Sequence, residues 1–294
     1  MRKVNKDFDN PPAILVNLSR QNKIKKALDD QSAHHISNSD YSPKAVKDAL
    51  EALYNEKCSY CDSTVKQVAA LQVEHYRPKN GVLEDANHKG YYWLAVEWSN
   101  LVLGCPVCNG QGSKGNKFPI MGKRVASQNP FGPDGAFSRQ MLYPDHAPLA
   151  DEKPLLLHPE IDDPAEHFKY DAFGLMRGTT KRGKETINIC NLNRDHLYSE
   201  RQSIINYFLT QCKIIFAGKV EFGLPNQVVD ALLMAQLKLL KGHRDNPKMP
   251  YTAYVGFILD NPRICLYPSV EPAFKADMIR AFGKFRKQEL ASKN

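Results

Sequence analysis

The chain has 294 residues, of which 42% are hydrophobic and 24% are charged, and its formal net charge is +8. This composition is typical of a soluble globular protein, and the length suffices for one large domain or two smaller ones. No run of about 18 apolar residues occurs, and the N-terminus lacks the apolar core of a signal peptide, so we expect a cytoplasmic protein with no membrane segment. The surplus of positive charge suits a polyanionic partner.

Residues 1–57 are expected to form a helical N-terminal segment. Residues 20–28 predict a short helix, and Ser42-Pro43 predicts the start of an amphipathic helix that ends near Asn55. Between these helices, the adjacent His34 and His35 could be read as a metal-binding pair. Neighbouring side chains point apart on a helix or strand, so a solvated loop is the favoured interpretation.

Two Cys-x-x-Cys pairs, Cys58/Cys61 and Cys105/Cys108, are the most specific signal in the sequence. Two such thiolate pairs can close a tetrahedral zinc site, and a closed site of this kind is structural. The chain has seven cysteines, and an odd total argues against a disulfide framework. The other three stand singly in apolar surroundings and are interpreted as core residues: Cys190, Cys212 and Cys265.

The segment between the two pairs carries further polar residues with chemical potential. Residues 69–75 read as a strand that ends in Glu74-His75, Asn100 precedes the second pair, and Asn109 follows it directly. These side chains cannot join a filled four-sulfur shell, so they are free to build a second site. A plain zinc ribbon usually separates its pairs by about 15–20 residues and has no use for a Glu-His strand.

This arrangement resembles the HNH nucleases, through Val73-Glu74-His75, Asn100-Leu101 and Cys105-Pro106-Val107-Cys108-Asn109. The wider context is similar to a narrower group, the PtuB-like nucleases of Septu-type and retron-associated anti-phage systems. That likeness extends over residues 40–210 and includes Trp93-Leu94, Trp98, Lys117-Phe118-Pro119, Glu185-Thr186-Ile187 and the segment Asn191 to Arg194. The fold class it implies is α+β, with a small zinc-stabilised ββα-metal core at residues 58–120 inside a mostly α-helical chain.

The resemblance also implies a role for each polar residue. His75 is the candidate general base, because a neutral imidazole can accept a proton from water. Glu74 and Asn109 are implied as ligands of a catalytic Mg²⁺ or Mn²⁺, and Asn100 is implied to hold the loop that carries the base.

Several basic residues flank this predicted site and are candidates for contacting nucleic acid, although a solvated rim explains them equally well: Arg77, Lys79, Lys114 and Lys117. Many members of the family have a lysine three residues after the last Asn, whereas here Lys114 is the fifth residue. Which lysine faces the substrate is therefore open.

Residues 121–294 are expected to form a mostly helical C-terminal region. Gly and Pro enrichment over residues 121–159 predicts a long irregular surface connection and a plausible domain boundary. Asp162-Asp163-Pro164 predicts a helix cap, and residues 169–177 predict a hairpin. Amphipathic helices are predicted over residues 194–217, 225–241 and 273–290, the first two ended by Gly218 and Gly242.

The predicted function is a metal-dependent endonuclease, with DNA favoured over RNA as substrate. The alternative is a zinc-stabilised nucleic-acid-binding or scaffold module without catalytic activity. The resemblance further implies an SMC- or ABC-like ATPase partner (PtuA-like), together with a retron reverse transcriptase and its nucleic acid in the retron-associated systems.

Overall fold

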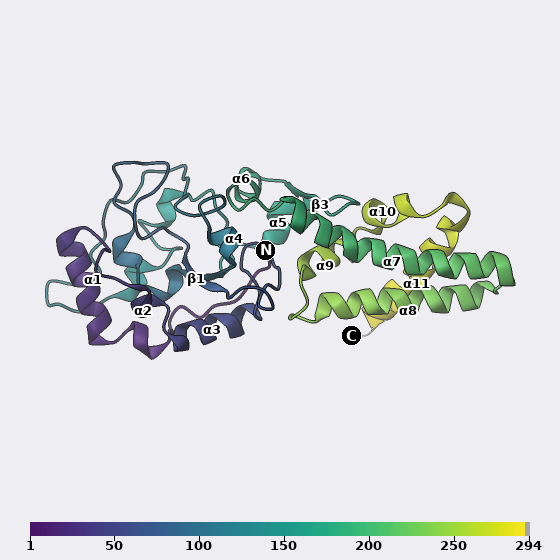
Figure 1. Cartoon of the computed structure of the whole chain (residues 1–294), viewed down its shortest axis with the longest axis horizontal. Helices are drawn as coiled ribbons and strands as arrows, with labels where there is room; N and C mark the ends of the chain where they lie inside the picture. The colour runs from purple at the N-terminus through teal and green to yellow at the C-terminus, as the bar shows by residue number, and fades with distance from the viewer. Residues whose placement is uncertain (292–294) are drawn as a thin grey trace. The chain divides into compact units, whose positions relative to one another are not determined.

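A computed structural model of the chain describes residues 1–291 and divides into two compact units (Figure 1). Unit 1 comprises Met1–Phe168 and Gly178–Leu192, and unit 2 comprises Lys169–Arg177 and residues 193–291. About half of the chain is helical, but the long helices belong to unit 2, whereas unit 1 consists of short elements and loops. The two units do not test the predicted division into segments 1–57, 58–120 and 121–294, which stays a prediction.

Unit 1 contains six α-helices and one two-stranded sheet among the residues that the structure describes. The helices are α1 (Leu18–Asp30), α2 (Asn38–Tyr41), α3 (Lys44–Tyr54), α4 (Pro106–Asn109), α5 (Pro164–His167) and α6 (Lys181–Ile189). The strands are β1 (Gln72–His75) and β2 (Leu101–Gly104).

The predicted N-terminal helices are confirmed, and local capping explains their bounds. The side chain of Asn17 accepts a hydrogen bond from the backbone N–H of Arg20 at the start of α1. At the other end, Gln31 takes the left-handed conformation with φ 47°. α3 begins directly after Pro43 and ends at Tyr54, and its capping residue Asn55 is also left-handed with φ 53°. Both C-terminal caps use residues in the conformation that commonly ends a helix.

β1 and β2 pair antiparallel, with Glu74 opposite Val102 and His75 opposite Leu101. β1 is shorter than the predicted strand because the preceding chain turns, with the Ala69 N–H bonded to the Val65 carbonyl. α3 packs against both strands. The chain between the strands forms short 3-10 turns over Tyr92–Leu94 and Trp98–Asn100, and the two tryptophans are buried as predicted.

The irregular segment 121–159 lies inside unit 1, so the structure does not place a boundary between compact units there. Leu155, Leu156 and Leu157 are buried in this segment, and the Glu152 carboxylate accepts hydrogen bonds from Arg77 and Tyr91. Gly and Pro enrichment indicated the irregular backbone correctly. It could not show that this backbone supplies core leucines and a buried acid.

Unit 2 is built from α7 (Asp195–Phe222), α8 (Asn226–Asp245), α9 (Thr252–Asp260), α10 (Pro262–Cys265) and α11 (Lys275–Ala291). α8 lies against α7, α9 and α11. The predicted hairpin is confirmed as β3 (Phe168–Tyr170) and β4 (Met176–Gly178), and Asp163 caps α5 as expected. Within residues 1–291, no helix combines the length and the apolar character that crossing a membrane requires.

Two predicted helix ends are wrong. α7 continues through Gly218 to Phe222 and is capped by Gly223, which has φ 63°, and α8 continues through Gly242 to Asp245. Gly in a helix interior costs roughly 1 kcal/mol relative to Ala, which the packing of a long helix can offset. The three single cysteines are buried as predicted, and burial raises the pKa of each thiol to about 12.

A buried ion pair fixes the N-terminal segment to the sheet. The Lys6 ammonium donates to the Trp98 carbonyl at 2.7 Å, to the Leu101 carbonyl at 2.5 Å and to Glu160 Oε1 at 3.1 Å. Tyr54 donates to the same Glu160 oxygen at 2.5 Å. Lys6 therefore satisfies one backbone carbonyl in the turn before β2 and one at the first residue of β2.

We expect Lys6→Ala to lower the free energy of unfolding of unit 1 by about 3–5 kcal/mol, because the change leaves the Glu160 carboxylate buried without its cation. Both tryptophans of the chain lie in unit 1, so tryptophan fluorescence during urea denaturation reports this unit. The exposed Lys3→Ala is the matched control. Equal midpoints for the two variants would contradict a structural role for Lys6.

Candidate active site

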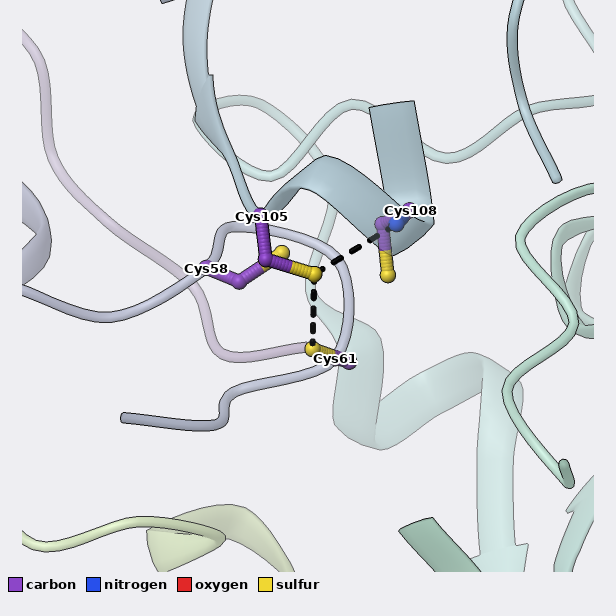
Figure 2. Close-up of side chains that lie close together, drawn as sticks. All are labelled: Cys58, Cys61, Cys105 and Cys108. Carbon is purple, nitrogen blue, oxygen red and sulfur yellow. Dashed lines mark hydrogen bonds between the residues drawn. The ribbon is translucent and has the colours of Figure 1, made fainter. Parts of the chain in front are cut away.

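The four predicted zinc ligands lie together in unit 1. Cys58, Cys61, Cys105 and Cys108 are all buried, and their sulfur atoms lie within 4.8 Å of one another (Figure 2). The Cys61 and Cys105 sulfurs are 4.0 Å apart, which is far longer than a disulfide bond. Cys105 caps the short helix α4, because its sulfur accepts a hydrogen bond from the Cys108 N–H at 3.4 Å.

The donor set of this cluster fits zinc. Four thiolates at about 2.3 Å from a tetrahedral Zn²⁺ lie roughly 3.8 Å from one another, close to the separation found here. Burial raises the pKa of Cys58, whereas hydrogen bonds from the neighbouring thiols lower the pKa of Cys61. Four buried sulfurs thus face one point that a single cation would fill.

Glu74 and His75 end strand β1 beside this cluster and line a cleft of about 570 Å³. The cleft is also lined by Asn109 from the end of α4, and by residues of the two adjacent loops, among them Pro78, Lys79, Asn80, Gln111, Lys114, Asn116 and Lys117. The strand end and the short helix therefore bring three predicted site residues to one cleft.

The tautomer of His75 follows from its hydrogen bond. Its Nε2 lies 2.9 Å from the Ala95 carbonyl oxygen, and a carbonyl can only accept, so Nε2 carries the proton. Nδ1 of the neutral ring then keeps its lone pair. Burial lowers the pKa of His75 to about 3, so the ring is neutral at physiological pH and its Nδ1 is unprotonated.

Glu74 is paired with Lys114. The Lys114 ammonium donates to Glu74 Oε1 at 2.6 Å and to the His75 carbonyl at 2.8 Å. Burial raises the pKa of the Glu74 carboxyl, while the Lys114 charge acts in the opposite direction. Lys114 thus donates a hydrogen bond to one of the two oxygens of the carboxylate that is predicted to bind a divalent ion.

Asn109 lies across Gly104 from Glu74. A Cβ placed on Gly104 would lie 3.5 Å from the Glu74 Cβ and 3.6 Å from the Asn109 Cβ. Asn109 donates through Nδ2 to Gln72 Oε1 at 2.8 Å, which leaves its side-chain oxygen as an acceptor. A carboxylate and an amide oxygen are ligands that Mg²⁺ or Mn²⁺ accepts.

Asn100 binds the backbone beside the end of β1. It is buried and accepts from the Arg77 N–H at 2.8 Å while donating to the Arg77 carbonyl at 3.0 Å and the Leu94 carbonyl at 3.2 Å. These bonds fix the backbone two residues after His75, and they connect it to the turn that precedes Ala95. One amide side chain therefore holds both the strand end and the partner of His75.

Three of the four predicted nucleic-acid contacts, Lys79, Lys114 and Lys117, line the cleft. Arg77 is the exception. Its side chain is buried, and it donates to Glu152 at 2.9 Å and to the Leu149 carbonyl at 2.8 Å. The prediction that Arg77 contacts nucleic acid does not fit this position.

Tyr41 contacts the site but was missed in the sequence. Its ring centroid lies 4.5 Å from that of His75, edge to face, and the Lys79 ammonium lies 5.7 Å from the Tyr41 ring. Tyr41 is the last residue of α2, more than thirty positions before His75 in the sequence. Nothing in the local pattern of residues 38–41 indicates that contact.

The sequence of the chain is similar to several known proteins. The chain is 26% identical to the Septu protein PtuB of Bacillus mycoides (strain KBAB4) over 233 residues, which cover 73% of each protein. The PtuB of Bacillus thuringiensis is 24% identical over 65% of this chain and 60% of its own length. The chain is thus similar to the PtuB proteins of Septu systems over most of its length.

Another relative, from Vibrio cholerae, is provisionally named as the HNH endonuclease of retron Vc95. It is 25% identical over 67% of this chain and 80% of its own length. The Septu protein PtuA of Bacillus mycoides is 34% identical over 167 residues, which are 55% of this chain and 21% of PtuA. No known family profile matches the chain, and no solved structure matches it.

We expect the purified PtuB-like protein to retain about one tightly held zinc ion per chain after dialysis against a mild chelator. Cys58→Ser should lose that zinc and much of its solubility, because removal of one ligand opens the shell that joins two distant segments. Elemental analysis gives the zinc content. Cys212→Ser, which changes a buried cysteine of unit 2, should keep the zinc; a folded, zinc-free Cys58→Ser protein would show that the cluster does not hold the fold.

Proposed function

We propose that this PtuB-like chain is a metal-dependent HNH endonuclease that acts in a Septu-type anti-phage defence system. The observation that carries the proposal is the cleft that His75, Glu74 and Asn109 line, in the same unit as the four-cysteine cluster. The order of strand, strand and short helix over residues 72–109 supports the ββα-metal interpretation. The retron and PtuB relatives support the same reading.

Phosphodiester hydrolysis requires a base for the attacking water and positive charge near the phosphate. His75 would take the proton at Nδ1, since its other ring nitrogen is held by Ala95. Lys79 and Lys117 would hold phosphate oxygens, because both line the cleft. An Mg²⁺ or Mn²⁺ ion on Glu74 and Asn109 would stabilise the negative charge that develops on the phosphate.

The favoured substrate is DNA, which rests on the family resemblance and not on the cleft geometry. Water is the proposed nucleophile, so the reaction does not need a sugar 2′-hydroxyl. The alternative function is a zinc-stabilised binding or scaffold module without catalysis. A cleft lined by a neutral histidine, a glutamate and an asparagine suits a hydrolase better than such a module.

We expect His75→Ala to lower the cleavage rate by about 10²–10⁴-fold, because it removes the general base. The assay incubates purified protein with Mg²⁺ or Mn²⁺ and with plasmid DNA, single-stranded DNA or RNA in parallel. Glu74→Gln and Asn109→Ala should instead raise the concentration of divalent ion needed for half-maximal cleavage.

The exposed histidine His146 provides the matched control for these variants. His146→Ala should cleave as the parent does, and all variants should keep the zinc content of the parent. If His75→Ala cleaved as fast as the parent, another group would have to be the base. If the parent bound DNA or RNA without cleaving either, in every metal, the binding-module alternative would replace the nuclease.

We further propose that unit 2 binds a PtuA-like ATPase that restrains or licenses the nuclease. The support is twofold. PtuA of Bacillus mycoides is a longer protein that contains a stretch similar to this chain. Two segments joined in one polypeptide meet each other at a high effective concentration, which favours contact between them. In unit 2, α7 and α8 also form a groove of about 340 Å³ at which Tyr207 is 68% exposed and Leu239 67% exposed.

The double variant Tyr207→Asp, Leu239→Asp should lose co-purification with a co-expressed PtuA-like partner, because two charges would have to be buried in the interface. Val68→Asp, which changes an 88% exposed residue of unit 1, is the matched control and should keep the complex. Retention of the complex by the double variant would exclude this groove. A parent protein that never co-purifies with the partner would favour a nuclease that acts alone.

A further inference from the structure

The turn that follows α1 brings three metal-ligating side chains together, at a place separate from the cysteine cluster and the cleft. The ligand atoms of Asp30, His34 and His35 lie within 4.8 Å of one another. The prediction of a loop here is confirmed, but the turn does not separate the adjacent histidines. Their ring centroids are 5.1 Å apart with the rings nearly perpendicular, and a nitrogen of each faces the same Asp30 oxygen.

The tautomer of His35 is fixed by a backbone carbonyl. His35 Nε2 lies 3.0 Å from the Lys23 carbonyl oxygen, which can only accept, so Nε2 carries the proton. Nδ1 then holds a lone pair in the neutral ring. That atom is buried, makes no hydrogen bond with a described residue, and lies 3.7 Å from Asp30 Oδ2. Two electron-rich atoms thus face each other inside the turn.

The separations indicate what could lie between these atoms. A charged N–H···O hydrogen bond is about 2.7–2.9 Å long, so a proton alone does not bridge 3.7 Å well. His34 Nε2 lies 4.0 Å from the same oxygen. Zinc bonds of about 2.0–2.2 Å to nitrogen and oxygen place two ligands of one ion roughly 3.3–3.5 Å apart. The nitrogens of His35 and His34 would therefore need to approach Asp30 Oδ2 by roughly 0.2–0.7 Å to share an ion.

Both histidines have the outer partners that metal-bound imidazoles usually have. The second ring nitrogen of His35 donates to the Lys23 carbonyl, and Nδ1 of His34 lies 3.2 Å from the Ser32 hydroxyl oxygen. The positive charge of Lys23 is directed to Asp40, 2.5 Å away. Asp30 is the last residue of α1, where the partial negative charge of the helix end favours a cation.

We propose that Asp30, His34 and His35 form a second metal site, which binds a divalent transition ion of the zinc class through two imidazole nitrogens and one carboxylate oxygen. Imidazole with carboxylate selects this class over Mg²⁺ or Ca²⁺, which prefer oxygen alone. Water fills the remaining position. The ion ties the end of α1 to the turn that leads into α2, and thus into Tyr41, which contacts His75.

The test titrates Zn²⁺ into untagged full-length protein that has kept its tightly bound zinc, and counts the ions by calorimetry and elemental analysis. The parent should bind one further zinc ion per chain, whereas Asp30→Asn and His35→Ala should not bind it. Ser32→Ala should retain the site with about 10–100-fold weaker affinity, as expected for loss of an outer partner. None of these readouts depends on nuclease activity.

A matched control is available in the same unit. His146 and Asp145 form an exposed pair with nitrogen and oxygen 3.0 Å apart, but no third ligand groups with them among residues 1–291. His146→Ala should therefore bind the additional zinc as the parent does. With Co²⁺ in place of Zn²⁺, the additional ion should show no thiolate charge-transfer absorption, which separates it from an ion exchanged into the cysteine cluster.

Two outcomes would overturn the proposal. One is a parent that binds no additional zinc at millimolar concentration, which would leave Asp30 and the two histidines as an ion pair formed on protonation. The other is an additional ion that persists in the double variant Asp30→Asn, His35→Ala with unchanged affinity. Circular dichroism and tryptophan fluorescence of each variant confirm that unit 1 is folded before either result is interpreted.

Discussion

The four-sulfur cluster is the constraint on which the candidate site depends. Cys58 and Cys61 precede β1, while Cys105 and Cys108 follow β2, so a single ion on the four sulfurs would close a loop that contains both strands. Closing a long loop limits the unfolded chain more than closing a short one. The sheet itself has only two strands of four residues each, and an isolated hairpin of that size is marginal in water. A metal ion on the cluster would add the stability that two short paired strands do not provide alone.

Buried polar contacts then orient the strand end within that frame. Asn100 binds the backbone of Arg77, and Lys6 binds the carbonyls of Trp98, in the turn before β2, and of Leu101, the first residue of β2. Arg77 itself is turned away from the cleft toward Glu152. These groups would cost free energy if left unpaired, so each one fixes a single arrangement of the chain near His75. The precision of the site comes from these pairs, because the loops around it have little regular structure.

Sequence patterns predicted the parts of this site that depend on local spacing. The cysteine pairs were indicated by their spacing, and Glu74, His75 and Asn109 by the resemblance to HNH nucleases; the structure groups the four sulfurs, and the three other residues line one cleft. Contacts between distant segments could not be predicted in that way. Tyr41 reaches His75 through the packing of α2, and Arg77 is buried by an acid that lies 75 positions later. The predicted ends of α7 and α8 were wrong for a related reason. A glycine such as Gly218 costs a helix little free energy, so packing of the residues beyond it can keep the helix going.

The pairing of Glu74 with Lys114 shows how the cleft can balance its charges. A buried carboxylate needs a cation nearby, and Lys114 provides one at 2.6 Å, while Glu74 and Asn109 both line the cleft. A divalent ion there would add charge beside an ammonium, which is unfavourable until an anion arrives. A phosphate group would supply that anion. The cleft would therefore bind its metal ion and its nucleic acid cooperatively, with each one reducing the repulsion that the other meets among Lys79, Lys114 and Lys117.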